Sequence, residues 1–180
     1  FLLSEHGIFL RELYLALSRM PETEKNRRFL LNLNRALVKM NYHFADIITS
    51  LGEFNRTWQL RFGAPADRIV YLANGVDPQS FVPAPERRPD RPTVLTMARI
   101  SPIKGIDTLM RAAAIVRKRI PDIRFRVCGD VADEDYYGRV LTIIEENDLR
   151  PCVEFGVTSD PVSAYQQAHV FCLPSNTEGM

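Results

Sequence analysis

Residues 93–128 read TVLTMARISPIKGIDTLMRAAAIVRKRIPDIRFRVC, and this stretch has the pattern of a strand, a helix and a second strand. The helical part, 107–120, places Leu109, Ala113 and Val116 on one apolar stripe. In the run that follows it, apolar residues alternate with arginines, as they do in a half-covered strand. Two strands joined by a crossover helix form a parallel pair covered by that helix. The stretch therefore predicts a parallel α/β sheet.

The same alternation of strands and helices continues toward the carboxyl end of the chain. The expected strands are 93–97, 123–128, 153–155 and 170–173, and the expected helices are 107–120, 135–147 and 162–168. In sheets of this kind, ligands bind at the carboxyl ends of the strands. Residues in the loops that leave the strands are therefore the first candidates for a binding site.

A run rich in proline, residues 78–92, separates this region from the amino-terminal part. Proline lacks a backbone N–H, so the run builds neither a helix nor a central strand. We place the domain boundary in it, between a part over 1–85 and a part over 86–180. The elements expected in the first part are a helix over 24–44, a strand over 46–49, a helix over 53–62 and a strand over 69–72. The first helix has an apolar face of Phe29, Leu30, Leu33, Leu37, Met40 and Phe44.

Composition excludes several classes of protein. The 180 residues contain 23 Lys and Arg against 22 Asp and Glu, for a formal charge of +1, so the basic balance of a nucleic-acid binder is missing. No apolar run approaches the roughly 18–20 residues that cross a bilayer. Cys128, Cys152 and Cys172 are widely spaced, and we interpret them as buried thiols in a reducing compartment. We expect a soluble, cytoplasmic protein. From the residues at its two ends, we also expect the chain to be a fragment of a longer protein.

The loop after the strand 93–97 reads ARISPIKG and leads into a helix. It brings Arg99 and Lys104 to the carboxyl end of the sheet, beside a helix N-terminus, whose N–H groups attract anions. A diphosphate site and a pair of solvated loop cations fit this spacing equally well. The loop is neither a Walker A sequence nor a G-x-G-x-x-G fingerprint, so ATP hydrolysis and dinucleotide binding lack support.

Two further groups could carry chemistry. Glu178 follows the last expected strand and would face the same end of the sheet, although a carboxylate at a helix start explains it as simply. His6 lies in a polar loop and could be a polar contact, a general base or a hydrogen-bonded structural histidine. The chain has no cluster of Cys, His and Asp at metal-ligand spacing and no G-x-S-x-G nucleophile, so no metal site is expected.

The order and spacing of several motifs resemble the retaining family-four glycosyltransferases of the GT-B fold (glycosyl transferases group 1). The matching stretches are LANGVD at 72–77 with Phe81 and Pro83, ARISPIKG at 98–105, and Glu178-Gly179. SEHGIF at 4–9 with Arg11-Glu12, together with Asn55 and Gln59, is similar to the branch that polymerises the Pel exopolysaccharide from UDP-glucose.

This resemblance implies a GT-B fold of two Rossmann-like domains, here an incomplete acceptor-side domain over 1–85 and an incomplete donor-binding domain over 86–180. It implies that Arg99, Lys104 and Gly105 hold the diphosphate of the donor. It also implies that the transferred sugar is contacted by Glu178, Gly179 and Met180. His6 would reach the reacting centre from the amino-terminal domain, for orientation and charge stabilisation. The expected substrates are a nucleotide-sugar, UDP-glucose first, and a growing glycan. No cofactor or metal is implied, and the resemblance allows peripheral association with a membrane polysaccharide-export complex.

The chain departs from the family pattern where the family's second glutamate, beyond Glu178, has no counterpart. We therefore expect the chain as written to be inactive and to bind the donor weakly. Two other functions stay open at the level of the residues: a GT-B UDP-sugar epimerase and a non-catalytic module that binds nucleotide-sugars. The sequence leaves the oligomeric state undetermined.

Overall fold

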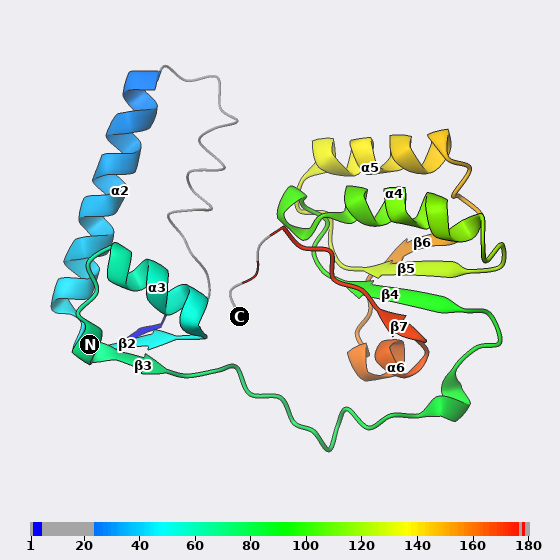
Figure 1. Ribbon diagram of the computed structural model, residues 1–180, viewed down its shortest axis with the longest axis horizontal. Helices are drawn as coiled ribbons and strands as arrows, with labels where there is room; N and C mark the ends of the chain where they lie inside the picture. Colours follow the sequence, from blue (N-terminus) through cyan, green and yellow to red (C-terminus); the bar gives the residue numbers. More distant parts are fainter. Residues whose placement is uncertain (1, 5–23, 177, 179–180) are drawn as a thin grey trace. The chain divides into compact units, whose positions relative to one another are not determined.

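The computed structural model describes residues 2–4, 24–176 and 178. It divides the chain into two compact units, one of residues 1–76 with 178–180 and one of residues 77–177 (Figure 1). The division after Val76 lies just before the proline-rich run.

The first unit has a three-stranded parallel sheet. Its elements are β1 (Leu2–Ser4), α2 (Glu24–Phe44), β2 (Ile47–Ser50), α3 (Glu53–Arg61) and β3 (Ile69–Tyr71), and the strand order is β1-β2-β3. The long helix, its follower and two of the strands lie within one residue of their expected limits. Strand β1 was not expected, because three residues are too few to show an alternation of apolar and polar positions.

The expected apolar face of α2 remains largely exposed. Phe29 and Phe44 are 67% and 65% exposed, and Leu33, Leu37 and Met40 share their side of the helix and are exposed as well. Instead, Val38 and Tyr42 pack on the small core around Ile48 and Ala64. The periodicity thus predicted the helix correctly, but the stripe it marks is not the one that contacts the sheet.

The second unit has a four-stranded parallel sheet of order β6-β5-β4-β7. Its elements are β4 (Thr93–Met97), α4 (Ile106–Arg117), β5 (Arg124–Cys128), α5 (Glu134–Glu146), β6 (Val153–Gly156), α6 (Pro161–Gln166) and β7 (Val170–Phe171). Figure 1 shows α4 and α5 on one face of this sheet and α6 on the other. All four strands and three helices were expected, with ends that differ by at most three residues.

Two apolar cores hold this sheet, one on each face. The larger lies under α4 and α5 and includes Ile106, Met110, Phe125 and Val140, all nearly inaccessible to solvent. The smaller lies under α6 around Leu95. Because each fully buried large apolar side chain contributes about 1.5–3 kcal/mol, the first core dominates the stability of this unit.

Candidate functional site

The loop that leaves β4 is held to its neighbour by backbone hydrogen bonds. The Ala98 N–H donates to the Cys128 carbonyl over 3.0 Å, and the Ile100 N–H donates to the Asp130 carbonyl over 2.8 Å. Ile100 itself is buried, which anchors the loop in the core. The loop therefore leaves the sheet along a fixed path, with Arg99 exposed between these anchors.

The second cation of the loop lies in a short 3-10 helix, η3 (Pro102–Lys104). The Lys104 N–H donates to the Ser101 carbonyl over 3.0 Å, and its side chain is half-buried. Lys104 is followed by Gly105 in the left-handed conformation, with φ of +63°, and then by α4. Both cations are thus at the carboxyl end of β4, as the sequence predicts. Whether they bind one diphosphate stays a prediction.

The segment after β7 packs against this loop. A Cβ atom on Gly105 would lie 2.2 Å from the Pro174 carbonyl oxygen, so only glycine fits there. The Asn176 N–H donates to the Ile103 carbonyl, and the Asn176 Nδ2 amide donates to the Pro102 carbonyl, each over 2.8 Å. Two loops that follow different strands are therefore fastened together at this edge of the sheet, within the second unit.

This contact predicts the effect of Asn176→Ala. The change removes the side-chain hydrogen bond to Pro102, which costs about 1 kcal/mol. It should also raise the hydrogen-exchange rates of the Ile103 and Lys104 amides. Asn147→Ala is the matched control, because the Asn147 side chain likewise donates to a carbonyl, that of Ile143, but far along the chain from the loop. Equal exchange rates of the loop amides in the two variants would contradict the fastening role.

The start of α4 differs from the expectation of free N–H groups. The Asp107 N–H donates to the Tyr136 hydroxyl of α5 over 2.9 Å, and that hydroxyl donates to the Asp107 Oδ1 atom over 2.5 Å. At least one amide of the first turn is therefore occupied by the protein itself. The sequence analysis did not identify Tyr136 as a residue of this site. A tyrosine on the apolar stripe of a helix is a signal for such a contact, because a buried tyrosine hydroxyl usually finds a hydrogen-bond partner.

Of the remaining predicted site residues, the structure describes only Glu178. His6, Gly179 and Met180 lie outside the described residues. Glu178 is exposed and belongs to the first unit, not to the unit that holds Arg99. The convergence of Glu178 with the two cations therefore stays a prediction.

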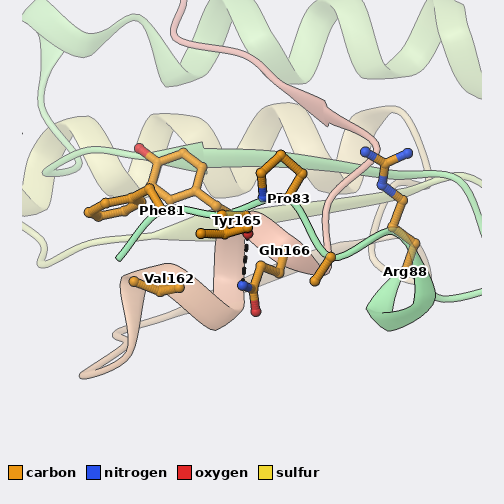
Figure 2. A pocket seen from close by; sticks show the side chains of 8 residues that line it. Phe81, Pro83, Arg88, Val162, Tyr165 and Gln166 are labelled. Atoms are coloured by element: carbon orange, nitrogen blue, oxygen red, sulfur yellow. Dashed lines mark hydrogen bonds between the residues drawn. The ribbon is translucent and has the colours of Figure 1, made fainter. Parts of the chain in front are cut away.

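A separate cavity of about 300 Å³ lies between the proline-rich run, residues 78–92, and α6 (Figure 2). Its walls are mainly apolar, and Phe81 packs edge-on against Tyr165 with ring centroids 5.9 Å apart. Gln166 holds the proline-rich run against α6, because its Nε2 amide donates to the Val82 carbonyl over 3.0 Å and its Oε1 atom accepts from Arg87 over 2.8 Å. The lining includes neither Arg99 nor Lys104, so this cavity is distinct from the loop site.

Among the described residues, no three His, Cys, Asp or Glu side chains gather as metal ligands. None of the helices in that part of the chain has the length and apolar character needed to span a bilayer.

Models of known protein families match both parts of the chain. The model of the family "Glycosyl transferases group 1" matches residues 79–180, and a domain of unknown function, DUF3492, matches residues 1–67. A GDP-mannose-dependent alpha-(1-6)-phosphatidylinositol monomannoside mannosyltransferase of Mycolicibacterium smegmatis is 26% identical over 162 residues, which cover 83% of this chain and 42% of the relative. The chain thus spans about two fifths of the length of this curated relative.

A second curated relative and two solved structures are also similar to the chain. The putative colanic acid biosynthesis glycosyltransferase WcaL of Escherichia coli is 29% identical over 121 residues, 65% of this chain and 29% of the relative. Anabaena HepE, solved with UDP-glucose, superposes with a TM-score of 0.77 at 18% identity, covering 99% of this chain and 47% of that one. Sucrose-phosphate synthase of Thermosynechococcus elongatus gives 0.74 at 22% identity, covering 99% and 45%.

The structural likeness confirms the expected α/β fold, with its parallel sheets and Rossmann-like parts of GT-B type. Because the family model covers more than half of the sequence, the chain belongs to the glycosyl transferases group 1 family.

Proposed function

We propose that the chain is part of a retaining glycosyltransferase that transfers a hexose, glucose first, from a UDP-sugar to a growing glycan. The observation that carries the proposal is the loop after β4, which presents Arg99 and Lys104 at the carboxyl end of a parallel sheet on a backbone fixed by hydrogen bonds. The family membership makes a nucleotide-sugar donor the natural anion for this loop.

The two cations act on the leaving group. Breaking the bond between sugar and phosphate leaves an additional negative charge on the diphosphate, and a fixed cation stabilises this charge more in the transition state than in the ground state. The Arg99 guanidinium can donate two parallel hydrogen bonds to phosphate oxygens, whereas the Lys104 ammonium acts as a point charge. In this proposal, the two side chains provide the charge stabilisation without a metal.

The sugar contacts in the proposal come from other residues. Glu178 accepts hydrogen bonds from hydroxyls of the transferred hexose, the backbone of Gly179 and Met180 adds further contacts, and His6 orients the reacting centre. The match of the family model to residues 79–180, which include Glu178, supports this assignment.

Relatives support the substrate class at different levels of detail. The HepE structure was solved with UDP-glucose, and the name of WcaL refers to colanic acid biosynthesis, which favours a UDP-hexose and an exopolysaccharide. The mycobacterial relative is named as GDP-mannose-dependent, so the nucleotide has to be tested directly. We place the reaction in the cytoplasm, since all three cysteines are free thiols.

The test is a donor panel with the full-length enzyme. UDP-glucose, UDP-N-acetylglucosamine and GDP-mannose are each supplied with and without a glycan acceptor, and both released nucleotide and product anomers are followed by NMR. We expect UDP release that depends on acceptor and an α-linked product. If the donor is epimerised in the absence of acceptor, the protein is an epimerase and the transferase proposal is wrong. If the donor binds but is not turned over, the protein is a binding module and the proposal is equally wrong. The 180-residue chain alone is expected to give no transfer.

A further inference from the structure

The first turn of α4 has an unusual cap that comes from another helix. The N-cap residue Gly105 has no side chain, and the Leu109 N–H makes the first bond inside the helix, to the Gly105 carbonyl over 3.1 Å. The amides of residues 106–108 therefore have no acceptor within the helix. Tyr136 of α5 supplies one, because its hydroxyl accepts from the Asp107 N–H and donates to the carboxylate of the same residue.

The position of that hydroxyl is fixed by α5. Tyr136 is 3% exposed and belongs to the core between the helices and the sheet. Its own N–H donates to the Asp133 carboxylate over 2.8 Å, which caps the start of α5. Burial and the hydrogen bond to Asp107 raise the pKa of Tyr136 to about 12, so the hydroxyl keeps its proton at neutral pH and remains a donor.

We infer that Tyr136 is a positioning residue for the donor site: its hydroxyl holds the first turn of α4 and, through Gly105, the orientation of Lys104. This inference rests on the proposed function, in which Lys104 contacts the diphosphate. Lys104 lies three residues before Asp107, and Gly105 between them is packed against Pro174. The turn is thus fixed by the Pro174 carbonyl on Gly105 and by the Tyr136 hydroxyl on Asp107.

The same contact limits how the diphosphate binds. The Asp107 amide is engaged by Tyr136, and the Asp107 carboxylate is held at the same place, where it would repel a phosphate. The donor therefore depends on the side chains of Arg99 and Lys104 more than on this amide of the helix. A small displacement of Lys104 should accordingly lower the rate of sugar transfer.

The experiment compares Tyr136→Phe with Tyr137→Phe. Each change removes one hydroxyl, but the Tyr137 ring packs against Phe155 and is not part of the cap. In the 180-residue chain, we expect the Asp107 amide of Tyr136→Phe to exchange about tenfold faster than in the unchanged protein, and that of Tyr137→Phe to stay unchanged. Unaltered exchange at Asp107 in Tyr136→Phe would overturn the cap.

Kinetics of the full-length enzyme test the positioning. Tyr136→Phe should lower the kcat for transfer from the UDP-sugar about tenfold with KM within about threefold, since Lys104 stabilises charge that develops in the transition state and one lost hydrogen bond corresponds to about a factor of ten. Tyr137→Phe should change neither constant. Asp107→Asn should keep most of the rate of transfer, because the amide oxygen still accepts from the Tyr136 hydroxyl, whereas Asp107→Ala should resemble Tyr136→Phe.

The outcomes separate this inference from the proposed function. Faster exchange at Asp107 together with an unchanged kcat in Tyr136→Phe would overturn the positioning role while leaving the transferase intact. If the wild-type enzyme transfers sugar from none of the tested donors, the proposed function fails. The positioning role is then tested by the hydrogen-exchange rates of the Gly105 and Lys104 amides in Tyr136→Phe. Rates equal to those of the wild-type protein would overturn the inference.

Discussion

Replacing Lys104 by Ala should lower the rate of sugar transfer by a hundredfold to a thousandfold. The physical reason is that Lys104 gains interaction as negative charge develops on the leaving diphosphate, and one such preorganised contact is typically worth about 3–4 kcal/mol. The measurement is the kcat of the full-length enzyme at a saturating UDP-sugar concentration, with folding checked by circular dichroism.

Lys118→Ala is the matched control for this prediction. Lys118 lies just after the last residue of α4, is exposed, and has the same charge. Its loss should change stability by tenths of a kcal/mol and leave the rate unchanged. Similar rates for the two variants would remove Lys104 from the active site and with it the strongest support for the transferase mechanism.

Gly105→Ala should destabilise the second unit by about 2–4 kcal/mol. A non-glycine residue in the left-handed region costs about 1–3 kcal/mol, and the new methyl group would in addition approach the Pro174 carbonyl oxygen to 2.2 Å, so the backbone must move. The displacement should also reduce transfer, because Lys104 precedes this position. Urea denaturation followed by circular dichroism measures the change in unfolding free energy.

Gly138→Ala provides the opposite control on the neighbouring helix. Gly138 lies inside α5, and a Cβ atom there meets nothing within 4 Å. The same substitution should therefore stabilise the protein by up to about 1 kcal/mol, since alanine is the better helix former. If both glycine variants shifted the unfolding free energy in the same direction, the contact between Gly105 and Pro174 would not have the importance given to it here.

Much of the second unit could be predicted because its local patterns are strong. The alternation in 123–128 and the stripe of Leu109, Ala113 and Val116 reflect burial on one face, so the strand and helix appear where the sequence places them. The largest difference is the end of α4 at Arg117 instead of 120. The last turn before Pro121 is not continued as α-helix, and element ends are set by a few weak backbone contacts that periodicity does not show.

The first unit shows the limit of the same reasoning. The apolar residues of α2 have clear helical spacing, yet Val38 and Tyr42 contact the sheet while Phe29 and Phe44 are exposed. Periodicity reports which residues share a face; it does not report which element that face meets. The candidate site has the same limit, because Tyr136 enters it from a helix that begins 30 residues after η3 ends.

The sequence by itself determined the parallel α/β class and the place of Arg99 and Lys104 after a strand. Both follow from local spacing, because strands and helices are formed by residues close together in the chain. Only the tertiary structure decided that Pro174 and Asn176 fasten the cation loop and that Tyr136 caps α4. These contacts join residues that are far apart in the chain, and their geometry depends on how the strands order themselves in the sheet. Hydrogen bonds and close backbone approaches act over a few ångströms, so only the folded arrangement shows which distant groups come within that range.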